Sequence, residues 1–151
     1  MPELVIIRGL PGSGKSTYGE KHFPNHKHFE ADMFFTDKKT GKYKFDFTKL
    51  SAAHRWCQNA TYNALHRGSN VVVTNTFLMS WEFDAYIELV NELRMDCGLD
   101  VTLRVVEMKT QYQNVHGVPE DKMEKMRGRY QAWSSVREDL GIDDVIYQVV
   151  E

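Results

Sequence analysis

The sequence predicts an α/β fold of three layers, in which about five mostly parallel strands form a sheet with helices on both faces. Short runs of apolar, often β-branched residues recur along the chain without polar alternation, which is typical of strands buried on both faces. Segments with helical spacing of their apolar residues separate these runs, and strands that alternate with helices form parallel sheets. Ligands bind such sheets beyond the carboxyl ends of the strands, so the residues that follow each strand are the candidates for function.

The length and composition predict a single globular domain over residues 1–151. Hydrophobic residues make up 42% of the chain and charged residues 26%, which excludes a disordered segment. Nineteen Lys and Arg against 21 Asp and Glu give a net charge of −2. That balance argues against a strongly basic protein that binds nucleic acid along its whole surface, and it leaves room for a local basic site.

The two cysteines, Cys57 and Cys97, form no CxxC pair, so we expect neither a disulfide framework nor a zinc site. The chain has no apolar stretch near the roughly 18 residues of a membrane span, and its start does not resemble a signal peptide. We therefore expect a cytoplasmic protein that has no membrane partner. Nothing in the sequence implies an obligate protein partner.

The first third of the chain predicts strand, loop, helix and strand in turn. Residues 4–7 are apolar and largely β-branched, as in a buried central strand. A glycine-rich stretch over residues 9–14 follows, and residues 15–17 open a short helix that must end before Pro24. A second strand is expected near residues 27–31.

The middle of the chain predicts one long helix between two strands. Residues 34–47 are mixed in character, with a turn expected at Thr40-Gly41. A helix over about residues 48–67 follows, because small and apolar residues recur on one face. Residues 71–73 are three valines and predict the third strand.

The last third predicts two helices and two strands. Ser80 is placed to cap a helix that runs to about residue 95, and residues 101–106 form the fourth strand. Pro119 suits the first turn of a further helix. Four large side chains then recur at helical spacing: Met123, Met126, Tyr130 and Trp133. Residues 145–150 predict the last strand.

One complete motif lies between the first strand and the first helix. Residues 9–16 match G-x-x-x-x-G-K-[ST], the P-loop of nucleoside triphosphate-binding proteins, in the strand-to-helix context that the motif requires. Backbone N–H groups of the loop converge on a phosphate, Lys15 reaches the β- and γ-phosphates, and Ser16 offers its hydroxyl to Mg²⁺. We therefore expect a P-loop NTPase fold with ATP and Mg²⁺ as cofactors. The residues expected to bind ATP are Gly9, Leu10, Pro11, Gly12, Ser13, Gly14, Lys15, Ser16 and Thr17.

Asp32 follows the second strand and is the candidate catalytic base. Transfer of a phosphoryl group to a hydroxyl needs a group that orients the hydroxyl and accepts its proton, and a carboxylate can do both. No acidic residue ends the third strand, so Asp32 is also the carboxylate expected near the water shell of the metal. Asn75 and Thr76 at that strand end would orient the acceptor or Asp32. The alternatives are a capping or solvated role for Asp32 and capping of the next segment by Asn75 and Thr76.

A basic and aromatic segment follows Asp32. Residues 37–49 hold five lysines against two aspartates, and aromatic residues interleave with them. Lysines and aromatic rings together are typical of sites for phosphates and bases. We expect Phe35, Lys38 and Lys39 to bind the acceptor. The alternative is an ordinary solvated loop whose aromatic side chains turn inward.

Residues 114–119, Asn-Val-His-Gly-Val-Pro, come just before the helix that Pro119 begins, where a lid over the phosphates is expected. Lids of this kind usually supply an arginine that neutralises charge in the transition state. Residues 114–119 hold none, so Arg129, farther along the chain, is the candidate for this catalytic role. The alternative is that Arg129 is surface charge.

Taken in order, these segments resemble the small ATP-binding kinases related to polynucleotide 5′-hydroxyl kinase. The resemblance covers residues 3 to about 130, and its P-loop part is shared by all P-loop NTPases. The segments that carry it are residues 8–17, Ala31-Asp32, Tyr43-x-Phe45-Asp46, Ala53-His54-x-x-Cys57, residues 72–76 and residues 114–119.

The resemblance implies a five-stranded parallel sheet with the P-loop strand at its centre, ATP and Mg²⁺ as cofactors, and Asp32 as the base. It implies transfer of the γ-phosphate to a hydroxyl of a small-molecule nucleotide or to the 5′-hydroxyl of a nucleic-acid end. Such kinases usually carry an arginine shortly after this aspartate and another in the lid, and this chain has neither. Two alternatives therefore stay open: a nucleotide-binding regulatory module with little turnover, and an NTPase that transfers no phosphate.

Overall fold

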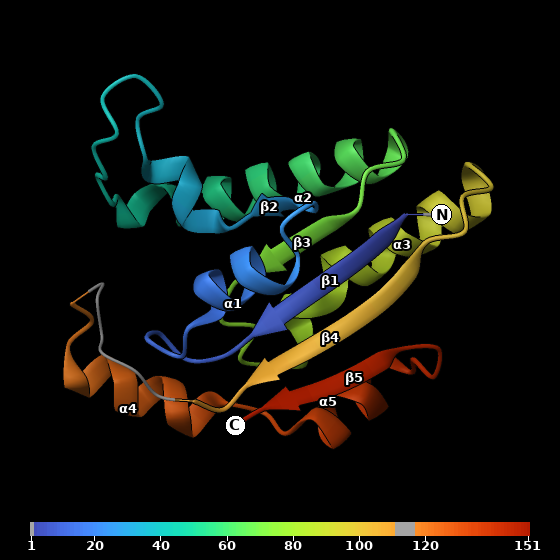
Figure 1. The fold of residues 1–151 in the computed structure, drawn as a ribbon. Coiled ribbons are helices and arrows are strands. Elements are labelled where there is room, and N and C mark those ends of the chain that lie inside the picture. The colour runs from blue at the N-terminus through green and yellow to red at the C-terminus, as the bar shows by residue number, and fades with distance from the viewer. Residues whose placement is uncertain (1, 111–116) are drawn as a thin grey trace.

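The computed structural model describes residues 2–110 and 117–151, and its centre is a five-stranded sheet in the order β2-β3-β1-β4-β5 (Figure 1). Every neighbouring pair of strands is parallel. The strands are β1 (Glu3–Arg8), β2 (Lys27–Phe29), β3 (Val71–Thr74), β4 (Thr102–Met108) and β5 (Ile146–Val150). The parallel sheet, and the central place of the strand that precedes the P-loop, are thus confirmed.

Helices cover both faces of the sheet, which makes the three layers of a P-loop NTPase fold (Figure 1). The α-helices are α1 (Lys15–His22), α2 (Leu50–His66), α3 (Asp84–Asp96), α4 (Glu120–Arg129) and α5 (Trp133–Leu140). Three short 3-10 turns precede or follow them: η1 (Ala31–Phe35), η2 (Phe47–Lys49) and η3 (Ser80–Phe83).

Residues 4–7 of β1 are all apolar because the two faces of the strand pack into different cores. Leu4 and Ile6 belong to the larger core, in which the sheet packs against α2, α3 and α5. Val5 and Ile7 belong to a smaller core on the other face, where Tyr18 of α1 packs. Alternating side chains of one strand point to opposite faces, so the middle of a strand covered on both faces favours apolar residues.

The expected cap at Ser80 is wrong. Ser80 is the first residue of the turn η3, which precedes α3, and the carboxylate of Glu82 accepts the backbone N–H of Met79 at 2.9 Å. The hydroxyl of Ser80 donates instead to Asp139 of α5 at 2.9 Å. A partner that lies 59 residues away along the chain uses the side chain that the local pattern assigned to capping.

A single helix from Pro119 through Trp133 is also wrong. Helix α4 ends at Arg129, the backbone is extended at Tyr130 and Ala132, and α5 begins at Trp133. The intervening Gln131 donates its backbone N–H to the carbonyl oxygen of Leu78 at 2.7 Å. Tertiary hydrogen bonds therefore replace the helical ones at this point, which spacing along the sequence could not show.

The break between α4 and α5 is organised by Arg8, the last residue of β1, whose side chain is fully buried. Its guanidinium donates to the carbonyl oxygens of Phe77 at 3.0 Å, Leu78 at 3.2 Å and Gln131 at 2.9 Å. It also lies over the ring of Tyr130, 4.3 Å from the ring centroid. Phe77 has a φ of 47°, a strained left-handed conformation that its buried contacts maintain.

The nearest strand neighbour of Arg8 is Glu107 on β4, which is also buried. Its carboxylate accepts the hydroxyl groups of Tyr130, at 3.1 Å, and of Tyr147. The buried cation and the buried carboxylate thus each have hydrogen-bonding partners, which a buried charge requires. Together they connect β1, β4 and β5 to the loops that follow β3 and α4.

Replacing this cation should cost much of the stability of the fold. Arg8→Met leaves three carbonyl oxygens and Glu107 buried without it, and we expect the free energy of unfolding to fall by about 3–5 kcal/mol. Denaturant unfolding measures the loss. Arg137→Met is the matched control, because Arg137 is exposed and its pair with Asp143 should contribute at most about 1 kcal/mol. An Arg8 variant as stable as the Arg137 control would contradict the structural role of the buried cation.

Candidate functional site

The candidate site lies where the carboxyl ends of the strands meet (Figure 1). The P-loop follows β1, Glu30 and the turn η1 follow β2, Asn75 and Thr76 follow β3, and Thr110 follows β4 shortly after its end. Because all strands are parallel, segments far apart in the sequence come together at this one edge.

The P-loop is shaped by close packing and by left-handed glycines. Gly12 and Gly14 have φ values of 81° and 85°, which side chains disfavour. A Cβ at Gly9 would lie 2.5 Å from the hydroxyl oxygen of Ser13 and 3.0 Å from the carbonyl oxygen of Met108, so no side chain fits there. The loop is therefore held against the ends of the strands with α1 beginning directly after it.

Two hydrogen bonds tie the loop to neighbouring strand ends. The N–H of Gly9 donates to the carbonyl oxygen of Thr76 at 3.2 Å, and the hydroxyl of Thr110 donates to the carbonyl oxygen of Ser13 at 2.6 Å. Thr76, proposed from the sequence as an acceptor ligand, thus holds the P-loop through its backbone. These ties fix the cradle in which N–H groups and the start of α1 would receive a phosphate.

The ammonium group of Lys15 is folded onto the loop itself. It donates to the carbonyl oxygens of Gly9 at 2.9 Å and Leu10 at 3.0 Å. Burial lowers the pKa of Lys15 to about 8, although the negative charges of Glu30 and Asp32 oppose that shift. A phosphate that takes the place of these carbonyl oxygens would bind the ammonium group, which already lies at the P-loop.

Glu30 is the site residue that the sequence analysis missed. One of its carboxylate oxygens, Oε2, accepts the hydroxyl of Ser16 and the hydroxyl of Thr74, both at 2.6 Å. Burial acts to raise the pKa of Glu30, but hydrogen bonds from His28, Ser16 and Thr74 outweigh it and lower the pKa to about 2. The signal was an acidic residue next to the end of the second strand. That strand was expected to continue to residue 31, whereas it ends at Phe29 and leaves Glu30 first after it.

Asp32 lies in the turn η1, two residues farther on. Its Oδ1 accepts the hydroxyl of Tyr43 at 3.0 Å, so the candidate base is joined to the lysine-rich segment. Asn75 accepts the backbone N–H of Ala31 at 2.9 Å through its Oδ1. The charge of Asp32 acts to raise the pKa of Lys15, and Asn75 holds the start of the turn that carries Asp32.

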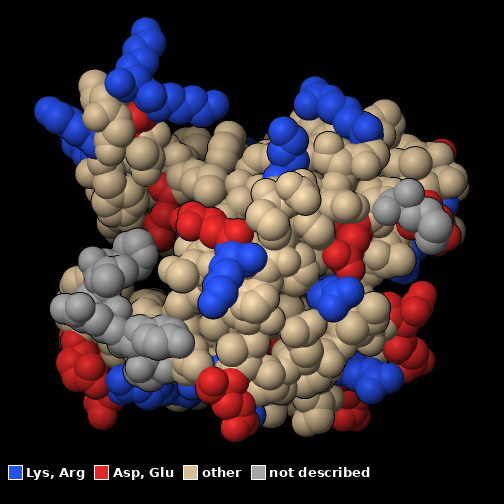
Figure 2. Space-filling model, viewed as in Figure 1, with Lys and Arg blue, Asp and Glu red and all other residues tan. Residues whose placement is uncertain are grey.

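The lysine-rich segment forms a projecting hairpin over residues 36–46. Thr36 and Tyr43 pair in an antiparallel bridge, and the N–H of Gly41 donates to the carbonyl oxygen of Asp37 at 2.7 Å to close the expected turn. Basic side chains gather on this projection (Figure 2). The exposed lysines are Lys38, Lys39, Lys42 and Lys44.

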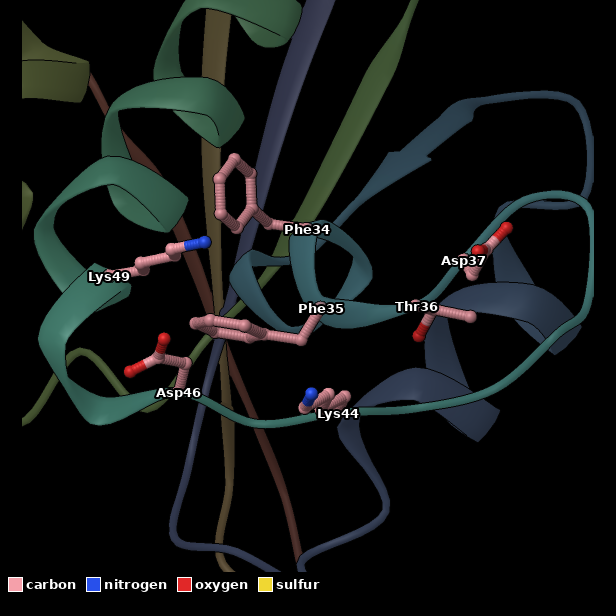
Figure 3. Close-up of a pocket in the computed structure, with 7 residues that line it drawn as sticks. All are labelled: Phe34, Phe35, Thr36, Asp37, Lys44, Asp46 and Lys49. Atoms are coloured by element: carbon pink, nitrogen blue, oxygen red, sulfur yellow. The ribbon is translucent and has the colours of Figure 1, made fainter.

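A cavity of about 320 Å³ lies at the base of the hairpin (Figure 3). Phe35, the predicted acceptor ligand, is only 7% exposed and forms part of its wall together with Phe34. Lys44 and Lys49 supply its positive charge, and Asp37 and Asp46 its negative charge. The remaining residue of its lining is Thr36.

Two of the predicted features are not brought to this edge by any described contact. Arg129 is exposed at the end of α4, and within residues 2–110 and 117–151 no hydrogen bond or ion pair joins it to the P-loop. Residues 114–116 of the predicted lid lie outside the described residues, and Pro119 precedes α4 as its capping residue. Both assignments stay predictions.

The donor set suits Mg²⁺, which prefers oxygen ligands and keeps much of its water. The described residues contain no group of three or more His, Cys, Asp or Glu that could bind a metal ion without help. They do place the Ser16 hydroxyl beside the Glu30 carboxylate, and a magnesium ion held by Ser16, phosphate oxygens and water fits that arrangement.

Over residues 2–110 and 117–151, no helix has the length and apolar character of a membrane span.

Comparison with known proteins agrees with this geometry. The model of a family described as an AAA domain matches residues 4–133. NEDD4-binding protein 2 of Homo sapiens is 31% identical over 140 residues, which is 88% of this chain and 8% of that protein. The chain therefore corresponds to a small part of this relative.

Two solved structures share the fold. A chain in the structure of the Pnkp1/Rnl/Hen1 RNA repair complex is similar with a TM-score of 0.62 and 17% identity, over 95% of this chain and 47% of that one. The crystal structure of a fungal RNA kinase is similar with a TM-score of 0.60 and 19% identity, over 97% of this chain and 38% of that one. At these identities the likeness establishes the fold alone, which is the three-layer fold of P-loop NTPases.

Nucleotide binding should depend on the protonation of Lys15. Its pKa of about 8 means that the ammonium loses its proton as the pH rises through that value, and phosphates bind the protonated form. ATP affinity should therefore fall about tenfold per pH unit above that pKa, with uptake of a proton on binding. Isothermal titration calorimetry in buffers of different ionisation enthalpy measures both effects. Lys15→Met should bind ATP more weakly at neutral pH and show no such pH dependence; an unchanged pH profile in this variant would refute the role of Lys15.

Proposed function

The chain belongs to the AAA domain family, and we propose that it is an ATP-dependent phosphotransferase that moves the γ-phosphate to a hydroxyl group of an acceptor. The observation that carries the proposal is the place of Asp32. A P-loop alone would support any NTPase, but a carboxylate after β2, two strands from β1, whose charge acts to raise the pKa of Lys15, supports transfer to a hydroxyl.

Different residues of the site bind the phosphates and accept the proton of the acceptor. The N–H groups of the P-loop and the ammonium of Lys15 hold the phosphates. The metal, when bound, would neutralise the charge that develops on the phosphate oxygens. Asp32 orients the acceptor hydroxyl and accepts its proton as the new O–P bond forms and the bond from the γ-phosphorus to its bridging oxygen breaks, so that ADP leaves. Tyr43 donates to one oxygen of Asp32, which leaves the other oxygen for the acceptor.

The acceptor that fits best carries a phosphate as well as a hydroxyl. The bond between Tyr43 and Asp32 joins the base to the hairpin, so an acceptor whose hydroxyl meets Asp32 has its remaining atoms near the lysines. Lysines bind phosphates as point charges, and exposed rings offer a face on which a base can stack. Phe45 and Phe47 are 49% and 77% exposed. Nucleotides and the 5′-hydroxyl ends of polynucleotides meet these requirements, and two structures of similar fold are an RNA repair complex and an RNA kinase.

A second candidate function is a nucleotide-binding module with little transfer. The observation that favours it is the lack of arginines near the site: the sequence has none between Arg8 and Arg55 and none between Arg104 and Arg127. Arg8 itself is turned away to buried carbonyl groups. A kinase that lacks a nearby arginine must neutralise the negative charge of the transition state with Lys15 and the metal.

A transfer assay separates the two functions. ATP labelled at the γ-phosphate is incubated with Mg²⁺ and, in turn, with nucleosides, nucleoside monophosphates, and DNA and RNA oligonucleotides with free 5′-hydroxyl groups. Label on one acceptor class would support the kinase. ATP binding without label on any acceptor, and without ADP release that an acceptor stimulates, would support the binding module.

The chemical role of Asp32 can be tested with one atom changed. Asp32→Asn keeps the shape and removes the charge, so transfer should fall about 10²–10⁴-fold. ATP affinity should change little, because the P-loop is a separate contact. Asp100→Asn, an exposed aspartate outside the site, is the control. Transfer by Asp32→Asn at the level of the control would mean that the carboxylate has only a structural role.

The role of the hairpin can be tested through its charge. Changing Lys38, Lys39, Lys42 and Lys44 together to Gln should raise the acceptor KM and weaken its dependence on salt, because fewer counterions are then released. ATP affinity should stay nearly constant. The control with the same loss of charge changes four exposed lysines elsewhere: Lys21, Lys27, Lys122 and Lys125. If both variants show the acceptor KM of the wild type across a salt series, the hairpin is only a solvated surface.

A further inference from the structure

Glu30 connects the three segments that would surround a metal ion. Its Oε2 accepts a hydrogen bond from Ser16 at the start of α1 and another from Thr74 at the end of β3, while Glu30 itself follows β2. His28 of β2 contacts the same group: its Nε2 lies 2.7 Å from the hydroxyl oxygen of Thr74 and 3.6 Å from the carboxylate. A single carboxylate oxygen thus holds the ends of two strands and the first turn of a helix together.

The direction of the hydrogen bond from Ser16 matters for metal binding. A serine hydroxyl has one proton and two lone pairs. Because Ser16 donates its proton to Glu30, both lone pairs of its oxygen are left to face away from the carboxylate. A hydroxyl oxygen held in this way can only accept, which is the state required of a ligand to Mg²⁺.

Glu30 also has a carboxylate oxygen that can accept a further hydrogen bond. Its side chain is 23% exposed, and within the described residues its second oxygen, Oε1, accepts no hydrogen bond. Hydrogen bonds from Ser16 and Thr74, together with the nearby His28 ring, favour the ionised form of the carboxylate. A water molecule bound to a metal beside Ser16 would find a fixed, charged acceptor in Oε1.

Thr74 explains why this carboxylate comes from β2. At the end of the strand next to the P-loop strand, the chain has a threonine and no acid. The hydroxyl of Thr74 is too short to replace a carboxylate, but it supports the carboxylate of the neighbouring strand. The negative charge at the metal site therefore comes from Glu30 and lies beside Ser16. Asp32, two residues later, is left to face the acceptor.

We propose that Glu30 is the positioning carboxylate of the metal site, which holds the Ser16 hydroxyl as an oxygen ligand for Mg²⁺ and accepts a hydrogen bond from a water molecule bound to the metal. The inference rests on the proposed use of ATP with Mg²⁺. The competing explanation is that Glu30 is only a structural link between β2, β3 and α1. The two differ in what happens to ATP in the absence of metal, because a negative charge near the phosphates repels free ATP and attracts the magnesium complex.

The test measures ATP binding by calorimetry with Mg²⁺ and, separately, with EDTA. Glu30→Gln keeps an oxygen that can accept from Ser16 and Thr74, and removes the charge. Its affinity for ATP with Mg²⁺ should fall about 10–100-fold, as expected for a residue that supports a metal ligand. Its affinity for metal-free ATP should stay the same or increase. Glu3→Gln is the control, since Glu3 is a half-buried, ion-paired glutamate of β1 outside the site.

Two further variants keep the test decisive. Ser16→Ala combined with Glu30→Gln should weaken binding of the magnesium complex by less than the sum of the two single losses, because one of the two roles of Glu30 acts through Ser16. Thr74→Val keeps the charge and removes one hydroxyl that holds it, so it should also reduce the gain from Mg²⁺, even if Glu30→Gln does not fold. A gain from Mg²⁺ equal to that of the wild type in both Glu30→Gln and Thr74→Val would overturn the proposal and leave the kinase function intact. A wild-type protein that binds no ATP under either condition would overturn both.

Discussion

The fold depends on how one buried charge is satisfied at the end of its central strand. Strand β1 is apolar on both faces up to Arg8, and the next residue begins the P-loop. A guanidinium at that point cannot reach water, so it must find carbonyl groups. It finds them in Phe77, Leu78 and Gln131, which lie about 70 and 123 residues away along the chain. The loops after β3 and α4 are thereby fastened directly beneath the P-loop.

The same constraint explains two local departures from regular structure. Phe77 takes a left-handed backbone conformation, and the helical spacing of residues 120–133 is interrupted at Tyr130 and Gln131. Each departure costs local backbone energy, and each aims a carbonyl group or an aromatic ring at Arg8. The strain is tolerated because an unsatisfied buried guanidinium would cost more.

The sequence predicts those features whose causes are local. Runs of apolar, often β-branched residues identified four of the five strands, because a strand covered on both faces needs little else, whereas β2 (Lys-His-Phe) carries no such run. The P-loop is recognisable because its glycines and its lysine lie within residues 9–16. The cap at Ser80 and the continuous helix through Trp133 failed because the competing partners, Asp139 and Arg8, are distant in sequence. Glu30 was missed for a different reason: the end of β2 was expected two residues too late, so the acid next to the strand end was counted as part of the strand.

The site has an acidic interior and a basic rim, and this division bears on what it can bind. The charges of Glu30 and Asp32 both act on Lys15, so they add negative charge where a triphosphate would bind. The amide groups of the P-loop and a single ammonium cannot offset two carboxylates and a triphosphate, so a divalent cation is the natural companion of the nucleotide here. The lysines lie outside, on a hairpin whose Tyr43 donates a hydrogen bond to Asp32. An acceptor with its own phosphate would therefore be attracted at the rim and present an uncharged hydroxyl to the interior, where the carboxylates would repel its phosphate.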